Sequence, residues 1–391
     1  MKNVLIYLYK DNLAPIGGHH GYNYNLNCQL KKMGVSNIHF IETNNGNFEG
    51  YKKGLNSIKN KKIKNFLIVL KNFIRKGQLM YGRNHHAVVD LKQYDIVHFQ
   101  STYWMYACRD SLKEYKGKVI LTSHSPTLLS KEIIDSELTV FEKRHMMWYY
   151  KRLIKMDEYA FNRADYVVFP CEEAEEPYYH AWNQFAEVKE KNAHKFKYML
   201  SGIEPCAPKV SRVAVRKKYC IPENAFVLCY VGRHNEIKGY DILKKIGEKV
   251  LEDSDVYILV AGREEPLKRY FHERWIEIGW TNDPHSLIAA SDALVLPNRE
   301  TYFDLVMLEV LSLGSLVVAS ATGGNRYYDR LMPNGVFLYN NIEEAISVIK
   351  KVKLMGKDEK ERLKGLNYKL YKDYFTSEIF AKNYVKLIES L

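Results

Sequence analysis

The residues best suited to chemistry lie in a turn that follows an expected buried strand at 226–232. Arg233 and Lys238 stand in this turn, and a helix is expected from about Tyr240. Two cations beside a helix N-terminus suit a diphosphate, because guanidinium offers a planar donor fork and ammonium a mobile charge. The alternative is a surface charge pair. Since their spacing across a turn does not place them on one helix face, a shared ligand explains both.

A second group of candidate residues follows an expected strand at 293–297. A helix from about Asp304 to Leu313 carries Glu309 among leucines, and an acid near a buried face needs a partner. Two ribose hydroxyls would suit it, and a structural salt bridge is the alternative. The free amides near Phe303–Leu305 could hold a phosphate oxygen.

The first half offers weaker signals. Gly17 and Gly18 stand between an expected strand at 4–9 and a helix around 22–32, where glycine lets backbone N–H groups approach an anion. A plain tight turn is the alternative. His124 follows an expected strand at 119–123 and could hydrogen-bond a sugar hydroxyl or a phosphate, or be a satisfied structural histidine.

Short apolar runs that alternate with helical patterns must position these residues. Uninterrupted Val, Ile and Leu are typical of parallel strands covered on both faces. The expected strands are 4–9, 38–42, 95–100, 119–123, 166–170, 196–200, 226–232, 256–261, 276–279, 293–297, 316–319 and 336–339.

Two such series predict an α/β fold of two doubly wound, Rossmann-like domains that face each other across a cleft. Ligands in such sheets lie outside the carboxyl ends of the strands. We expect an acceptor-side domain at 1–205 and a donor domain at 206–370. The last segment, 371–391, is expected to be a helix that could return to the first domain.

Composition excludes several classes of protein. The chain has 391 residues, of which 46% are hydrophobic, and six cysteines without a CxxC pair. Disorder, a zinc framework and a disulfide scaffold are therefore not expected. The first apolar run is too short for a signal peptide, and no run reaches the ~20 apolar residues of a spanning helix. The sequence predicts a cytoplasmic protein.

The net charge of +12 is concentrated in the first half. Ten Lys and Arg occur between Glu49 and Asp90 without one acid, and within 51–83 apolar residues follow helical spacing. This segment is interpreted as a helix on the anionic inner face of the cell membrane, with a core helix as the alternative. A nucleic-acid partner is not expected, because there is no aromatic-basic RNA motif and the second half is nearly neutral.

From Tyr230 through Asn325 the sequence resembles the donor domain of glycosyltransferase family 4, which has the GT-B fold. The matching sequences are Gly232-Arg233, Lys238-Gly239, Val260-Ala-Gly262, Ile278-Gly279-Trp280, Ala290 to Pro297, Leu308-Glu309, Gly314 and Gly323-Gly324. This covers about a quarter of the chain, and Gly17-Gly18 and His124 are similar to weaker marks of the family's first domain.

The resemblance implies roles for these residues. Arg233 and Lys238 would hold the donor diphosphate and Glu309 the ribose. Gly17 and Gly18 would approach the phosphates or sugar, and His124 would contact the donor sugar.

The loop before Glu309 departs from the family pattern, which has a first Glu eight residues earlier, followed by Gly-Phe-Gly. Here Thr301 is eight residues before Glu309 and Glu300 is nine before. Phe303 keeps its place, but Tyr302 and Asp304 replace the glycines. Either Glu300 or Thr301 fills the first acidic position.

The resemblance therefore implies a retaining transferase of a hexose-type sugar from a nucleotide diphosphate, expected to be UDP. No metal and no cofactor are expected, since the two cations replace a metal. The expected acceptor is a lipid-linked or polysaccharide intermediate of cell-surface glycan synthesis. A nucleotide-sugar epimerase of the same fold and a non-catalytic nucleotide-sugar-binding subunit are the alternatives.

Overall fold

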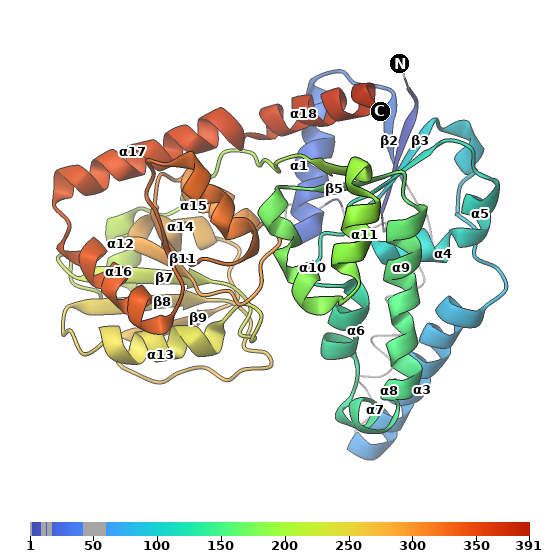
Figure 1. Cartoon of the computed structure of the whole chain (residues 1–391). Helices are drawn as coiled ribbons and strands as arrows, with labels where there is room; N and C mark the ends of the chain where they lie inside the picture. The colour runs from blue at the N-terminus through green and yellow to red at the C-terminus, as the bar shows by residue number, and fades with distance from the viewer. Residues whose placement is uncertain (1, 9–12, 14–17, 42–59) are drawn as a thin grey trace. The chain divides into compact units, whose positions relative to one another are not determined.

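The structure is a computed structural model that describes residues 2–8, 13, 18–41 and 60–391. The chain forms two compact units, each built on its own parallel sheet (Figure 1). Unit 1 comprises Met1–Phe169, Tyr178–Tyr198 and Val385–Leu391, and unit 2 comprises Pro170–Pro177 and Met199–Tyr384. The domain limits expected from the sequence stay predictions.

The sheet of unit 1 has six parallel strands in the order β2-β1-β3-β4-β5-β6. The strands are β1 (Val4–Tyr7), β2 (Ile38–Phe40), β3 (Ile96–Phe99), β4 (Lys118–Leu121), β5 (Tyr166–Phe169) and β6 (Phe196–Tyr198). The helices around it are α1 (Gly18–Lys32), α3 (Lys61–Tyr81), α4 (Thr102–Ala107), α5 (Arg109–Glu114), α6 (Leu129–Glu137), α7 (Val140–His145), α8 (Met147–Tyr150), α9 (Ile154–Arg163) and α11 (Phe185–Lys191), with short η1 (Leu91–Gln93), η2 (Lys151–Leu153) and η4 (Ala193–Lys195).

The sheet of unit 2 has the order β12-β11-β10-β7-β8-β9, again all parallel. Its strands are β7 (Phe226–Val231), β8 (Val256–Ala261), β9 (Trp275–Gly279), β10 (Ala293–Leu296), β11 (Leu316–Ser320) and β12 (Val336–Tyr339). Its helical segments are η3 (Glu172–Glu175), α12 (Arg212–Lys218), α13 (Tyr240–Val250), α14 (Pro284–Ala290), α15 (Leu305–Ser312), η5 (Gly323–Leu331), α16 (Ile342–Leu354) and α17 (Lys357–Tyr374). Helices α10 (Glu176–Ala181) and α18 (Ser377–Ser390) each cross a boundary between the two units in sequence.

All twelve expected strands are present, each ending within two residues of its predicted limits; Tyr9 and Glu42 lie outside the described residues. The central strands are almost fully buried, which explains their uninterrupted apolar sequences. The prediction of two doubly wound α/β domains is confirmed. Among the described residues, no helix combines the length and apolar character that a membrane span requires.

One helix boundary was predicted wrongly. Helix α1 begins at Gly18, whereas the sequence pattern placed its start around Tyr22. His19 and His20 form the first turn, and polar residues there carry no apolar periodicity that would reveal a helix. Gly18 is thus the first residue of α1, with φ of 53°.

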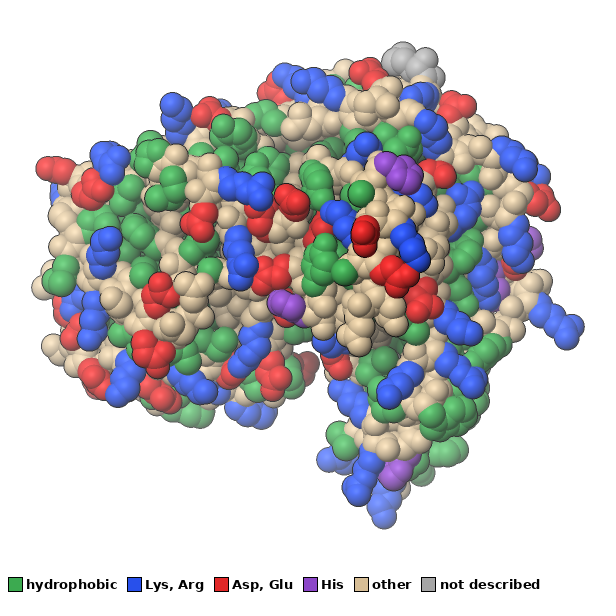
Figure 2. Space-filling model, viewed as in Figure 1, with side chains coloured by type: hydrophobic (Ala, Val, Ile, Leu, Met, Phe, Trp, Pro, Cys, Tyr) green, Lys and Arg blue, Asp and Glu red, His purple; other side chains and the backbone are tan. Residues whose placement is uncertain are grey.

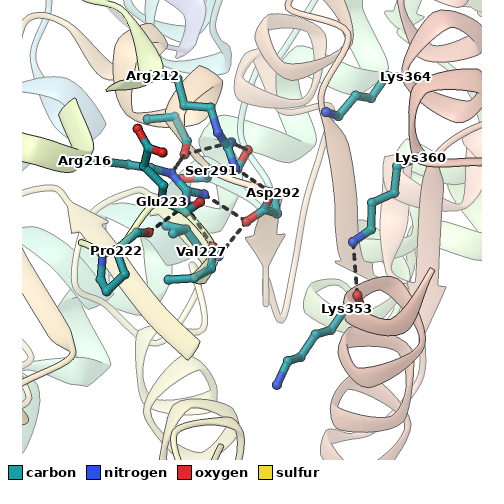
Figure 3. Close-up of polar contacts among 12 residues, drawn as sticks. Arg212, Arg216, Pro222, Glu223, Val227, Ser291, Asp292, Lys353, Lys360 and Lys364 are labelled. Atoms are coloured by element: carbon teal, nitrogen blue, oxygen red, sulfur yellow. Dashed lines mark hydrogen bonds and ion pairs between the residues drawn. The ribbon is translucent and has the colours of Figure 1, made fainter. Parts of the chain in front are cut away.

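A buried guanidinium fixes the end of the second sheet opposite the candidate site (Figure 3). Arg216 on α12 is 2% exposed and donates to the carbonyls of Ala290 and of the turn at 222–225. Its Nη2 lies 3.1 Å from Oδ2 of Asp292, which also accepts the backbone N–H of Val227 at 2.7 Å. This network holds the amino ends of β7 and β10 in register, since a buried charge must be fully paired.

Candidate functional site

Glycine shapes the turn between β7 and α13 that carries both predicted cations. Gly239 has φ of 66°, and a Cβ there would lie 1.6 Å from the carbonyl oxygen of Pro297, at the end of β10. Gly262 after β8 approaches Gly232 as closely, because its Cβ would lie 1.7 Å from that carbonyl oxygen. Only residues without a side chain allow these loops at the carboxyl edge of the sheet to meet.

Lys238 already holds an anionic group. Its Nζ lies 2.6 and 2.7 Å from the two carboxylate oxygens of Asp304. The side chain of Lys238 is 28% exposed and that of Asp304 18% exposed, so the pair is only partly open to solvent. Arg233 in the same turn has an exposed side chain.

Asp304 precedes α15 in the N-cap position, but its side chain does not cap the helix. Its carboxylate instead accepts hydrogen bonds from Lys238 and, at 2.6 Å, from the amide of Asn298. Arg299 next to Asn298 pairs with Asp241 in the first turn of α13, and this pairing lowers the pKa of the Asp241 carboxyl. The start of α13 and the loop before α15 are therefore joined by two ion pairs.

The loop residues that depart from the family pattern lie in different environments. Glu300 is half-buried, whereas Thr301 is 1% exposed, and the Thr301 hydroxyl lacks a hydrogen-bond partner among the described residues. The carbonyl of Thr301 accepts the N–H of Gly324 at 3.3 Å, and a Cβ on Gly323 would lie 2.0 Å from that carbonyl oxygen.

Phe303 anchors this loop. It is 8% exposed and packs with Tyr328 and Phe375, with ring centroids 6.0 and 6.1 Å away. Leu305, which is half-buried, opens α15. The Phe303 ring therefore supports the loop from within the fold, and only the backbone near Phe303–Leu305 remains suited to a phosphate oxygen.

Glu309 has a partner that the sequence did not reveal. Its Oε2 lies 3.6 Å from Nε2 of His285 on α14, and their side chains are 24% and 27% exposed. The neighbouring Cys206 and Glu309 side chains raise the pKa of His285 to about 10, which favours the charged imidazole at neutral pH. Glu309 thus makes an ion pair with His285 and keeps a partly exposed carboxylate, and its role toward a ribose stays a prediction.

In unit 1, His124 follows β4 in a left-handed backbone conformation with φ of 57°, which is uncommon outside glycine. Its Nε2 lies 2.7 Å from Oε1 of Gln100, which follows β3, and its ring meets that of Tyr22 edge-on at 4.5 Å. Burial lowers the pKa of His124 well below its usual value, so the imidazole is neutral at pH 7. It can exchange hydrogen bonds with a hydroxyl group without acting as a cation.

The start of α1 lies near His124, because the ring of His19 is 6.3 Å from the His124 ring. Burial lowers the pKa of His19 to about 4, so this imidazole is also neutral. Gly18 opens the helix beside it, while Gly17 lies outside the described residues.

The predicted residues therefore form two groups. In unit 2, Lys238 and Asp304 meet directly, and Glu309 lies on the helix that Asp304 precedes. In unit 1, His124 lies beside the start of α1.

Sequence reasoning missed His285 and Cys206, because no local pattern links them to Glu309. Asp253 and Asp255, two acids that stand before β8, pair with Lys353 rather than with each other: its Nζ lies 3.2 Å from Oδ2 of Asp253 and 2.5 Å from Oδ1 of Asp255. The described residues contain no group of three or more His, Cys, Asp or Glu that could hold a metal ion.

Comparisons with known proteins agree with this architecture. In Escherichia coli, UDP-Gal:alpha-D-GlcNAc-diphosphoundecaprenol alpha-1,3-galactosyltransferase is 27% identical over 38% of this chain and 42% of its own length. The chain spans less than half the length of the curated relatives that it matches first.

Several solved structures match over nearly their whole length, including the following two. Sucrose-phosphate synthase from Thermosynechococcus elongatus has a TM-score of 0.65 at 15% identity, covering 99% of this chain and 98% of its own. Anabaena HepE, solved in complex with UDP and glucose, has a TM-score of 0.62 at 14% identity and full coverage of both chains. These likenesses establish the GT-B fold.

Two family models match separate halves of the chain. The model described as "Glycosyltransferase Family 4" matches residues 16–182, and the one described as "Glycosyl transferases group 1" matches residues 225–353. The second match contains Arg233, Lys238 and Glu309, and the first contains His124. Both matches are to glycosyltransferase models, and the chain is a glycosyltransferase of the GT-B type.

Proposed function

We propose that this protein transfers a hexose from UDP to a lipid-linked or polysaccharide acceptor in cell-surface glycan synthesis, with retention of anomeric configuration. The observation that carries the proposal is the built anion site at the start of α15. There the Lys238 ammonium holds a carboxylate at 2.6 Å, in a turn that also carries the exposed guanidinium of Arg233.

The chemical task of such a site is to stabilise the diphosphate as it leaves the sugar. Negative charge grows on the leaving group while the sugar becomes oxocarbenium-like, and fixed cations and helix-end amides offset it. Arg233 and Lys238 supply the cations, and the backbone at Phe303–Leu305 supplies the amides. Because these groups act as a metal would, we propose a metal-independent reaction without a cofactor or a stable covalent intermediate.

Other residues orient the donor. Glu309 would accept the ribose hydroxyls, since its carboxylate remains partly exposed beside His285. Neutral His124 would hydrogen-bond the donor sugar, and Gly17 and Gly18 would bring backbone N–H groups to it. We assign the first acidic position to Glu300 rather than Thr301, because Thr301 is 1% exposed and has little surface for a ligand.

The identity of the donor and acceptor is supported by the relatives. HepE was solved with UDP and glucose, and the Escherichia coli relative is named for a UDP-galactose donor and a diphosphoundecaprenol acceptor. The basic first half of the chain suits an anionic, membrane-bound acceptor. We therefore place the protein peripherally at the inner face of the cell membrane.

A UDP-release assay with purified protein tests the reaction. Lys238→Ala and Arg233→Ala should each lower turnover by about 10²-fold or more, as loss of one transition-state donor does elsewhere. Lys245→Ala, an exposed lysine on α13, is the matched control and should keep wild-type turnover. Retained turnover in both site variants would rule out the assignment.

One observation favours a second candidate, a subunit that binds a nucleotide sugar without catalysis. Asp304 stands where the family has glycine, and its carboxylate already occupies Lys238. In that case UDP-sugars would raise the melting temperature by mass action, but no UDP would be released with any acceptor. An epimerase would instead convert the donor sugar with no acceptor present, which a donor-only incubation would reveal.

A further inference from the structure

Helix α3 exposes an apolar stripe. Its side chains recur every three or four residues, which places them on one face of the helix. Their exposed fractions are 52% for Ile63, 65% for Phe66, 42% for Leu70, 41% for Phe73 and 49% for Ile74. A core-facing stripe at this spacing would be buried, so the alternative of a core helix is wrong for this face.

The opposite side of α3 attaches the helix to unit 1. Lys76 is 1% exposed and its Nζ lies 2.6 Å from Oε2 of Glu137. Leu79 belongs to the buried cluster that contains Tyr150 and Leu153. These residues attach α3 to the fold and leave most of the apolar stripe exposed.

The apolar surface continues onto the neighbouring short helices. The ring of Phe73 stacks on Tyr149 at 4.7 Å, and Tyr149 contacts Trp148, which is 65% exposed. On α7, Val140 is 83% and Phe141 57% exposed. Figure 1 shows α3, α7 and α8 together at one end of unit 1, and in Figure 2 hydrophobic and basic side chains gather there.

The two segments that carry these side chains are strongly basic, although Glu137 of α6 pairs with Lys76 of α3. Residues 60–83 contain seven Lys and Arg and no acid, and residues 139–155 contain five and one acid. That acid, Glu142, is 0% exposed and is bound by Tyr150, Asn72 and the cap of α7. The surface is thus both apolar and basic.

We infer that this α3–α8 surface, made of the exposed apolar residues on α3, α7 and α8 and the basic residues among them, docks on an anionic lipid bilayer. The apolar side chains would enter the headgroup boundary, while each nearby Lys or Arg adds ~1 kcal/mol of attraction to anionic lipid. A second copy of the chain is a poor occupant, because it would bring two basic surfaces together. The inference deepens the proposed peripheral location and is independent of the donor chemistry.

Co-sedimentation with vesicles tests the inference. The wild-type protein should bind vesicles of phosphatidylcholine mixed with phosphatidylglycerol at least about tenfold more tightly than phosphatidylcholine alone. Phe66→Ser with Ile74→Ser should weaken binding to the mixed vesicles about tenfold or more, since two side chains no longer insert. Lys62→Glu with Arg75→Glu should remove the preference for anionic lipid.

Matched controls lie on unit 2. Leu354→Ser removes an apolar side chain that is 85% exposed, and Lys217→Glu reverses an exposed charge; both should bind vesicles as the wild type does. Melting temperature, with and without UDP, shows that each variant is folded and tests the donor site separately. Equal binding to both kinds of vesicle, or unchanged binding by the α3 variants, would overturn the inference. So would a dimer in solution that the α3 substitutions dissociate while vesicle binding persists.

Discussion

Replacing Asp304 by Asn should tighten UDP binding. The donor diphosphate and the Asp304 carboxylate compete for the same ammonium, which now lies 2.6 Å from Asp304 Oδ1. Asparagine keeps the shape of the side chain and removes its charge. The substitution therefore frees Lys238 for the ligand and removes a negative charge from its path.

The expected gain follows from the geometry. A hydrogen bond to a charged group contributes about 1.5–3 kcal/mol. UDP must break the Lys238–Asp304 interaction in order to bind Lys238, so its binding free energy is less favourable by this amount. Since Lys238 is 28% exposed, solvent screening favours the lower limit, ~1.5 kcal/mol, which corresponds to about a tenfold lower Kd. Asp304→Gly, which restores the glycine of the family pattern, should act in the same direction.

Isothermal titration with UDP measures the effect. Asp241→Asn is the control, because it removes a carboxylate in the first turn of α13 that is paired with Arg299 and leaves the Lys238–Asp304 pair intact. In a Lys238→Ala background, Asp304→Asn should increase the affinity for UDP by less than it does in the wild type, since the two residues act as a pair. An unchanged or higher Kd in Asp304→Asn would refute the reasoning and would mean that the carboxylate positions Lys238 for the donor.

Three further predictions concern stability. Asp292→Ala leaves the Arg216 guanidinium buried without its carboxylate. Urea denaturation should therefore show a free energy of unfolding that is lower by about 3–5 kcal/mol. A loss below about 1 kcal/mol would contradict the role given to this network. Gly239→Ala should lower the free energy of unfolding by more than about 2 kcal/mol, because its φ is 66° and the new Cβ would meet the Pro297 carbonyl. Gly365→Ala is the control and should not destabilise the protein, since Gly365 lies in α17 with open space around it. The raised pKa of His285 predicts a stabilising contribution that is complete below about pH 6.5 and is lost as pH rises through about 10. In Glu309→Gln an NMR titration should find a lower His285 pKa, and an unchanged value would show that Glu309 does not hold the charge.

The strands and the main site helices could be predicted because their signals are local. Buried parallel strands need continuous apolar runs, and β8 and β12 have the limits that their sequences indicated. Helix α15 begins one residue after the predicted Asp304, since that residue occupies the N-cap. Each of these features depends on a few consecutive residues.

The pairings within the site could not be predicted in the same way. Lys238 and Asp304 are 66 residues apart, and only the packing of two loops at one sheet edge brings them together. His285 lies on a different helix from Glu309 and carries no motif of its own. Helical periodicity in α3 identified an apolar stripe but not its direction, because a core-facing stripe and a lipid-facing stripe have the same spacing.

The central claim is that the turn at 232–239 binds a pyrophosphoryl group, and comparing UDP with UMP by isothermal titration tests it most directly. The account predicts that the wild type binds UDP at least about tenfold more tightly than UMP, because the second phosphate reaches Arg233 and Lys238. It also predicts that the double substitution Arg233→Ala with Lys238→Ala removes this difference. Equal affinity for the two nucleotides in the wild type, or a difference that survives the double substitution, would contradict the account.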